Sequence, residues 1–242
     1  IITTKKGRTA QKPTIFYNGN VSVSVKKKAL DVMNADEYRN FIKSYYGDDS
    51  EAATKLGDAD TDWQDEIYRA AISHDHNVTV SGGFKNMPYR VSFGYTNQEG
   101  ILKTSDFERY TANISVNPSF FQEHLTLNVN VKGMLANTRY ANTGAISAAT
   151  RMDPTQPIYS ADEKFQNFGG YFQWLKDGKD LNDPTWPYIT ERNAVRNPVA
   201  MLEQFNDKAK SKSAIGNIEL DYKIHGLEDL RLHMNFGADL ST

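Results

Sequence analysis

The sequence predicts an all-β protein, and specifically part of a transmembrane antiparallel β-barrel with about seven meandering strands. Seven segments of the 242-residue chain alternate apolar and polar side chains, and this period of two places successive side chains on opposite faces of a strand. No apolar run approaches the roughly 18 residues that a spanning helix needs, whereas a spanning strand needs only about 9–11. The connections also alternate between short turns and long inserts, as in outer-membrane barrels.

The composition excludes several other classes of protein. Hydrophobic residues make up only 39% of the chain, but aromatic residues reach 12%, and disordered chains are poor in aromatics. Lys and Arg number 28 against 30 Asp and Glu, for a net charge of −2, so the basic excess typical of nucleic-acid binding is lacking. The absence of cysteine excludes disulfides, thiolate metal sites and cysteine nucleophiles. A mean hydropathy of −0.62 is compatible with a barrel that carries large polar loops.

The first predicted strand runs from Ile15 to Val25, with apolar side chains at the odd positions. Six more strands follow by the same pattern, at residues 77–81, 89–96, 110–117, 125–132, 217–224 and 230–239. The polar faces of the first five strands consist mainly of Asn, Ser, Thr and Gly, with Arg90 and Lys132 as their charges. Such small neutral groups suit a hydrated lumen better than a sheet face in bulk water. Tyrosines near the strand ends are typical of interfacial girdles; they are Tyr17, Tyr89, Tyr95, Tyr110 and Tyr222.

The connections fall into two groups on opposite sides of the predicted sheet. Short turns at residues 85–88, 118–124 and 225–229 share one side. Long inserts at about 27–74 and 140–211 share the other side with the loop at 97–105. We expect short helices in both inserts, since residues 34–37 form a capping box, Thr61 or Asp62 caps a turn through Trp63–Arg69, and Asn197-Pro198 opens a helix through Phe205.

Alternation by itself does not separate a barrel from a soluble sandwich, because a sandwich also buries one face of each strand. A soluble or surface-attached β-rich binding module, such as an adhesin or a carbohydrate-binding domain, is therefore the alternative interpretation. That alternative predicts that residues 13–242 fold without detergent. A partial barrel predicts lipid dependence, because its open edges and its lipid-facing side chains are left uncovered.

Several segments resemble the SusC/RagA family of TonB-linked outer-membrane transporters. They are TDWQDEIY at residues 61–68, HNVTVSGG at 76–83, YRVSFGYTNQEGILK at 89–103, FERY at 107–110 and MDPTQP at 152–157. The opening residues 1–7 resemble the last strand of the family's plug domain. The resemblance covers nearly the whole chain. It implies a plug inside a barrel of about 22 strands, with residues 1–12 as the end of the plug and 13–242 as the N-terminal part of the barrel.

The resemblance also implies a function in transport. Because no catalytic constellation emerges from the residues, we expect neither enzymatic activity nor a cofactor, and an enzyme is the third interpretation after the binding module. A whole receptor of this family would import oligosaccharides or peptides through the outer membrane, with its long loops extracellular. Its partners would be TonB, which acts on a part outside this sequence, a SusD-like surface lipoprotein, and outer-membrane lipid. Both ends of the sequence fall within alternating patterns, so we expect a piece of a longer protein.

The candidate catalytic and metal motifs are weak. Residues 58–62 imitate the start of a calcium loop, but Trp63 and Arg69 stand where that loop needs Gly and Glu. We interpret this stretch as a solvated acidic loop that caps a helix. His74 and His76 could share one side of a strand but lack a nearby third ligand, so polar rim residues are the favoured interpretation. The nucleophile-elbow pattern Gly-x-Ser-x-Gly is absent.

One aromatic concentration in the second insert is a candidate functional site. Residues 159–188 hold eight aromatic side chains, including Phe165. The candidates for contact with substrate or with the lipoprotein are Tyr159, Phe168, Tyr171, Phe172, Trp174, Trp186 and Tyr188. Tyr and Trp suit interfaces because they combine an apolar body with a polar tip. Two interpretations stay open, namely direct ligand contact, with Asp153, Gln156 and Asn167 for polar orientation, and a small core that the insert needs for itself or packs on the lipoprotein.

Overall fold

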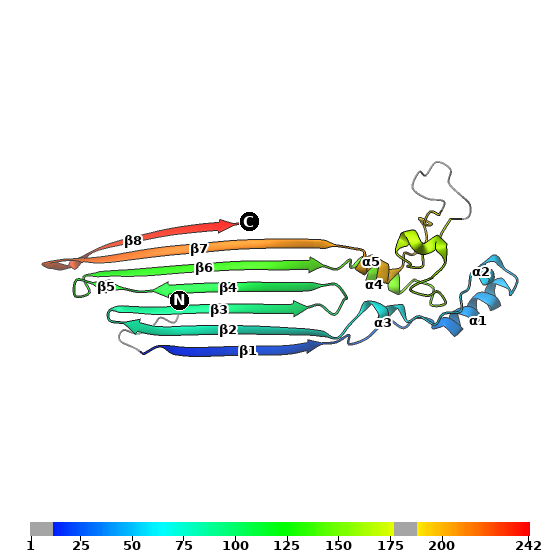
Figure 1. Cartoon of the computed structure of the whole chain (residues 1–242), viewed down its shortest axis with the longest axis horizontal. Coiled ribbons are helices and arrows are strands. Elements are labelled where there is room, and N and C mark those ends of the chain that lie inside the picture. Colours follow the sequence, from blue (N-terminus) through cyan, green and yellow to red (C-terminus); the bar gives the residue numbers. More distant parts are fainter. Residues whose placement is uncertain (1–11, 177–187) are drawn as a thin grey trace.

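A computed structural model describes residues 12–176 and 188–242, which form one antiparallel sheet with helices at one end (Figure 1). The strand order is β1-β2-β3-β4-β6-β7-β8, and the short β5 pairs with β6. The strands are β1 (Thr14–Ser24), β2 (Ala71–Phe84), β3 (Met87–Glu99), β4 (Asp106–Val116), β5 (Ser119–Phe120), β6 (Leu125–Tyr140), β7 (Asp207–Ile224) and β8 (Leu227–Ser241). Consecutive long strands are neighbours throughout, which confirms the predicted all-β meander.

Several strands are longer than the sequence pattern predicts. β2 begins at Ala71 rather than at residue 77, and β7 begins at Asp207 rather than at 217. The predicted bounds of the inserts are therefore wrong by several residues, because the inserts span 25–70 and 141–206. Most of the added residues break the apolar–polar alternation with polar or charged side chains, but backbone hydrogen bonds continue the ladder without regard to side-chain polarity.

The register aligns the predicted apolar faces across the whole sheet. Val80 pairs with Val91, Val91 with Ile114, and Ile114 with Val131. One row further along, Val129 lies between Val116 and Ile218. A register error of one residue would move every apolar side chain to the other face. The assignment of faces is therefore confirmed in detail.

The apolar face forms a band of limited height. On β6 the band extends from Leu125 to Leu135. Those ten residue steps rise about 34 Å along a strand, and a tilt of about 40° reduces this to about 26 Å. Transmembrane barrels carry an outward apolar band about 25 Å tall, so the band has the height that such a barrel requires.

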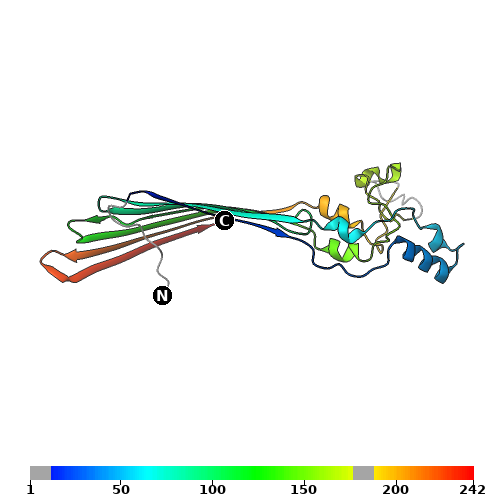
Figure 2. The same ribbon diagram turned by 90° about the horizontal axis from the view of Figure 1, so that it is seen from below.

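The described part of the sheet is a single layer, as its edge-on view shows (Figure 2). The turns between β2 and β3 and between β7 and β8 lie at one end, and the helical inserts lie at the other (Figure 1). The predicted separation of short turns from long inserts is thus confirmed. Within the described residues, no helix is long and apolar enough to cross a membrane. The predicted plug segment, 1–12, lies outside the described residues except for Lys12.

The inserts carry the helices α1 (Ala35–Tyr46), α2 (Glu51–Thr54), α3 (Trp63–Ile67), α4 (Gly144–Ala149) and α5 (Pro198–Glu203), and the 3₁₀ helix η1 (Glu163–Phe168). Both halves of the predicted capping box are present, because the Asn34 side chain accepts from the Glu37 N–H while Glu37 accepts from the Asn34 N–H. Asp62, rather than Thr61, caps α3.

Two of the predicted helices end earlier than expected. α3 stops at Ile67 because the backbone N–H of Arg69 donates to Ile101 O instead, 2.8 Å away. α5 stops at Glu203, two residues before Phe205. The helices α2, α4 and η1 were not predicted. Each has only four to six residues, too short to show a helical period.

Candidate binding surface in the two inserts

The two inserts pack into one body at the end of the sheet. Trp63 and Ile67 of α3, from the first insert, are 2% and 0% exposed. They share a hydrophobic core with residues of α4 and α5 from the second insert, among them Ala145, Ala149, Val199 and Leu202. Because side chains about 80 to 140 positions apart in the chain fill one core, each insert positions the other.

A short segment of the second insert, residues 152–157, fastens it to the first. The indole Nε1 of Trp63 donates to the carbonyl of Asp153 at 2.8 Å, away from solvent. The carbonyl of Thr155 accepts from the N–H of Ala59 at 3.0 Å. These bonds pair backbone groups that would otherwise be buried without partners, and the segment therefore acts as a fixed joint between the inserts.

The polar residues proposed for ligand orientation lie in different environments. Asp153 and Gln156 are 8% and 5% exposed and belong to the joint. The Asp153 carboxylate accepts from the N–H and the hydroxyl of Thr155, both at 2.7 Å, and the Gln156 amide donates to the carbonyl of Lys55 at 2.8 Å. Asn167, in contrast, is exposed. The first two side chains thus have structural partners within the protein.

Asn197 organises the second insert from a fully buried position, with 0% exposure. Its side-chain oxygen accepts from the N–H groups of Val199 and Ala200 and so caps α5. Its side-chain nitrogen donates to the carbonyls of Ile158 and Phe172, at 2.9 and 3.2 Å. One amide therefore joins α5 to the two segments that carry most of the aromatic side chains.

The aromatic candidates divide between core and surface. Tyr171 is 8% exposed, and Phe172 and Trp174 pack against the same core, in edge contact with ring centroids 5.2 Å apart. Tyr159 and Tyr188 are 54% and 40% exposed. Of the remaining three residues, Phe165 is buried, Phe168 is half-buried, and Trp186 lies outside the described residues. The insert thus has a core of its own and still presents aromatic rings to its surroundings.

Tyr159, Tyr171 and Glu203 form a hydroxyl–carboxylate cluster at the edge of that core. The Tyr171 hydroxyl donates to the Glu203 carboxylate, and the Tyr159 hydroxyl lies 3.3 Å from the same oxygen. Burial first, and then the hydrogen bond to Glu203, raise the pKa of Tyr171 well above its ordinary value. Tyr171 therefore stays a neutral donor and holds Tyr159 at the surface.

A second aromatic group lies on α1, in the first insert. Phe41, Tyr45 and Tyr46 are 42%, 70% and 56% exposed, and the rings of Phe41 and Tyr45 stack with centroids 5.7 Å apart. The helical spacing of these residues is visible in the sequence. That spacing is typical of the packing face of an amphipathic helix, and only the structure shows that Phe41 and Tyr45 are exposed.

A hollow of about 600 Å³ lies beside α1 and is lined by both inserts. Tyr38, Asp62 and Trp63 of the first insert line it together with Arg151 and Met152 of the second. Burial, followed by the nearby Asp153 carboxylate, raises the pKa of Tyr38. The hollow offers apolar and polar walls side by side, as a binding site for a polar organic molecule does.

The other motifs singled out from the sequence have local structural partners. His76 lies 2.7 Å from the Tyr17 hydroxyl, and His74 packs its ring against Tyr95, with centroids 5.6 Å apart. Both imidazoles lie on the apolar face of β2. In the acidic loop, Asp62 accepts from two N–H groups of α3 at 3.0 Å. No cluster of three or more potential metal ligands occurs in the part of the chain that the structure describes.

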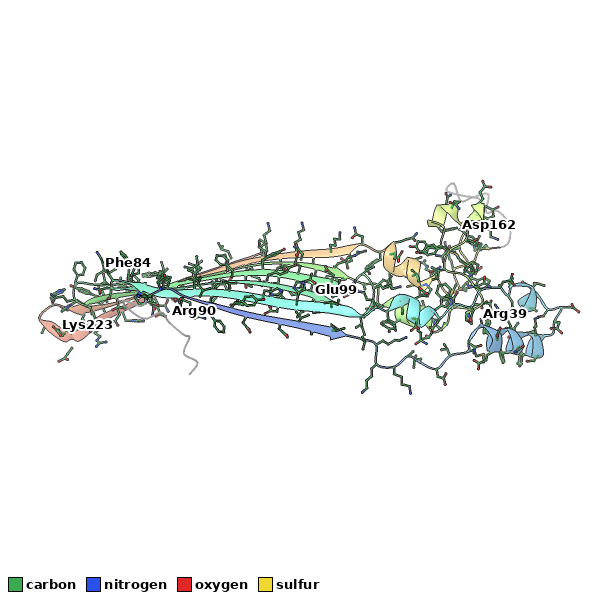
Figure 3. The ribbon with its side chains drawn as sticks, turned by 60° about the horizontal axis from the view of Figure 1, so that its bottom comes forward. Arg39, Phe84, Arg90, Glu99, Asp162 and Lys223 are labelled. Carbon is green, nitrogen blue, oxygen red and sulfur yellow. The ribbon has the colours of Figure 1, made fainter. Side chains whose placement is uncertain are left out.

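The polar face of the sheet carries its own hydrogen-bonded network. The Thr79 and Ser92 hydroxyls are buried and 2.9 Å apart, and the Thr96 hydroxyl donates to Asp75 at 2.6 Å. Arg90 and Lys223, which belong to this face, lie toward the turn end of the sheet, whereas Glu99 of the other face lies at the insert end (Figure 3). Small polar groups thus bond to one another and to Asp75 across the strands, as the sequence pattern predicts for a lumen.

Comparison with known proteins finds no matching family model but close curated relatives. The chain is 49% identical to the TonB-dependent receptor SusC of Bacteroides thetaiotaomicron over 240 residues, which cover 99% of this chain and 24% of SusC. It is 30% identical to the TonB-dependent receptor P3 of Formosa agariphila, over 94% of this chain and 21% of P3. The chain spans about a quarter of the length of the curated relatives it matches.

Solved structures share the same fold. The RagAB peptide transporter superimposes with a TM-score of 0.67 at 19% identity, over 98% of this chain and 29% of the other. The "closed-closed" state of the RagAB peptide importer gives a TM-score of 0.65 over the same 98% and 29%, again at 19% identity. At this level of identity the likeness shows the fold.

Proposed function

Because the chain belongs to the SusC/RagA family of TonB-linked outer-membrane transporters, we propose that it forms the N-terminal part of the barrel of a nutrient importer. The observation that carries this proposal is the sheet itself. One face is an apolar band with the height of a membrane's hydrocarbon layer, and the other is a network of small polar side chains. A sheet in lipid must satisfy its backbone groups within a closed barrel, and the open edges at β1 and β8 would join the remaining strands of the whole receptor.

The two faces then have separate functions. The apolar face contacts outer-membrane lipid, and the polar face lines the lumen against a plug, whose last residues are 1–12. The inserts lie on the extracellular side, since outer-membrane barrels place their long loops there and their short turns in the periplasm. TonB supplies energy through a part of the receptor outside this sequence. The receptor acts by transport, without catalysis.

The inserts provide the surface for a partner and a substrate. We place a SusD-like lipoprotein over them and oligosaccharides or peptides between the two proteins. Exposed Tyr159 and Tyr188 and half-buried Phe168 are suited to stack on sugar rings or grip peptide side chains. Tyr171, Phe172 and Trp174 support them from the core, and Trp186 belongs to the same group in the sequence. The exposed rings of α1 extend this surface.

Charge placed on the apolar face tests the membrane assignment. In the whole receptor, Val91→Asp and Val129→Asp should each block assembly into the outer membrane, because each puts a carboxylate into hydrocarbon. Asn130→Asp is the matched control, since it adds the same charge one residue away on the polar face. The measurement is the amount of receptor in the outer-membrane fraction whose gel migration shifts on heating. Normal assembly of the Val129 variant would contradict the proposal.

A further inference from the structure

The beginning of β7 carries a row of lysines that the sheet places on a single face. Residues 208–213 alternate lysine with Ala or Ser, so Lys208, Lys210 and Lys212 project on the same side. Their partners across the ladder are Arg139, Asn137 and Leu135, respectively. The three lysines and Arg139 are here termed the basic stripe. With about 6.8 Å between alternate residues, the lysines span about 14 Å along the strand.

The basic stripe continues the apolar face at the point where that face becomes polar. Lys212 lies in the row of Leu135, Tyr110 and Tyr95, which is the last apolar row toward the inserts. Lys210 and Lys208 lie in the next two rows. The stripe is therefore on the outer face of the sheet, where it begins in the last row of the apolar band and continues beyond that band toward the inserts.

The acidic groups on this part of the face leave the stripe with a positive excess. Glu108 accepts from the hydroxyls of Tyr110 and Tyr95, at 2.7 and 3.1 Å, and from Asn137, at 3.3 Å. Glu99 lies 3.6 Å from Arg69. Asp106 pairs with Arg139 in the ladder, but the ion pairs of the described residues include no member of the stripe. The Arg139 Nε atom is buried without a hydrogen-bond partner.

Two hollows adjoin the stripe. One, of about 540 Å³, is lined by Arg69, Arg139, Lys208 and Lys210 together with Glu99 and Asp106. The other, of about 850 Å³, is apolar and has Lys212 at its border. Ala112, Gly133 and Ala214 are paired in one row and form its floor, between the larger Phe93 and Leu240. Along β7 a cationic hollow thus lies next to an apolar trough of small residues, the first lined by Lys210 and the second by Lys212.

We propose that the basic stripe and this trough bind a phosphorylated lipid of the surrounding leaflet, with its phosphate on the lysines and Arg139 and an acyl chain over Ala112, Gly133 and Ala214. The inference rests on the proposed function, since it requires this face to be in contact with lipid. Ammonium and guanidinium groups donate charge-assisted hydrogen bonds to phosphate oxygens. A basic cluster at the edge of an apolar band matches both parts of an acidic lipid, because the cations bind its headgroup and the apolar side chains contact its acyl chain.

The test uses the whole receptor in a nonionic detergent, titrated with lipid A that carries a phosphate group and followed by native mass spectrometry. The variant is Lys208→Gln with Lys210→Gln and Lys212→Gln. The lysines are exposed, so the variant is expected to fold. Binding should weaken by about fivefold for each lysine and by about 100-fold for all three. The corresponding triple lysine-to-arginine variant should restore it.

The matched control removes three positive charges from the polar face, as Lys132→Gln with Lys223→Gln and Arg231→Gln, and should bind lipid like the wild type. Dephosphorylated lipid A should bind as weakly to the wild type as phosphorylated lipid A does to the glutamine variant. Equal binding of the two lipids, unchanged binding by the glutamine variant, or displacement of the lipid by millimolar inorganic phosphate would overturn the inference. A receptor that assembles normally and fails these tests contradicts only the lipid site, whereas a receptor missing from the outer membrane contradicts the proposed function.

Discussion

Replacement of Asn197 by alanine is expected to open the second insert while the sheet stays intact. The alanine removes the cap of α5, which is formed by two hydrogen bonds from Val199 and Ala200. It also removes the donor that satisfies the carbonyls of Ile158 and Phe172. Because the position is fully buried, water does not replace these partners without a local rearrangement.

The change in the free energy of local opening follows from the loss of these four hydrogen bonds. Loss of the helix cap costs about 1 kcal/mol, and each buried carbonyl left without a donor costs about 1–3 kcal/mol. A total of about 3–7 kcal/mol for local opening corresponds to an increase of roughly two to five orders of magnitude in the open population. Asn197→Asp keeps the acceptor for α5 but places a carboxylate oxygen against the carbonyls of Ile158 and Phe172 at a fully buried position, so it should open the insert at least as much as alanine does.

Hydrogen exchange of the whole receptor measures this opening directly. Amides of residues 158–172 and 197–203 should exchange faster in the Asn197→Ala variant, while those of β2 to β7 should be unchanged. Asn193→Ala is the control, because Asn193 is exposed in the same insert. If both variants exchange alike, Asn197 does not hold the insert together and the reasoning from its hydrogen bonds is refuted.

Three further predictions concern the band, the joint and the exposed aromatic surface. Val129→Arg, near the middle of the band, should destabilise the receptor in lipid by about 2–4 kcal/mol, whereas Leu125→Arg, at its edge, should cost only about 0–1 kcal/mol. The measurement is folding into lipid vesicles, and equal effects of the two variants would contradict the placement of the apolar band in the membrane. Gly57→Ala should loosen the first insert by about 1–3 kcal/mol, because a Cβ atom there overlaps the Thr155 carbonyl; unchanged proteolysis of the insert would contradict this. Tyr159→Ala should weaken binding of the lipoprotein or substrate by about 1 kcal/mol or more, while the heat-dependent gel migration of the receptor stays unchanged. If the variant binds as tightly as the wild type, Tyr159 is not part of the contact surface.

The sheet could be predicted because its signal is local. Alternation in segments such as 89–96 and 125–132 specifies both the strand and its face, and the pairing of Val91 with Ile114 follows from the short connection between their strands. The beginning of β7 could not be predicted this way. Its Lys-Ala-Lys-Ser pattern alternates in size and charge rather than in hydrophobicity, so it is typical of a polar loop until its pairing with β6 is seen.

The candidate site was only partly predictable, because burial in the inserts depends on contacts between distant segments. The aromatic group was visible in the sequence, but its pattern does not distinguish buried Tyr171 from exposed Tyr159. Their difference arises from packing against α5 and from the bond to Glu203. Similarly, Asp153 and Gln156 look like polar ligand contacts until the joint with residues 55–63 is seen.

The most direct test of the central claim is the state of the native protein in its source cells, measured by membrane fractionation and by gel migration before and after heating. A receptor of this family should be found in the outer-membrane fraction, require detergent for extraction, and shift its migration on heating, and peptides from residues 13–242 should come from that shifted species. Recovery of those peptides from a soluble species whose migration does not depend on heating would contradict the assignment of the apolar band to lipid, and with it the proposed function.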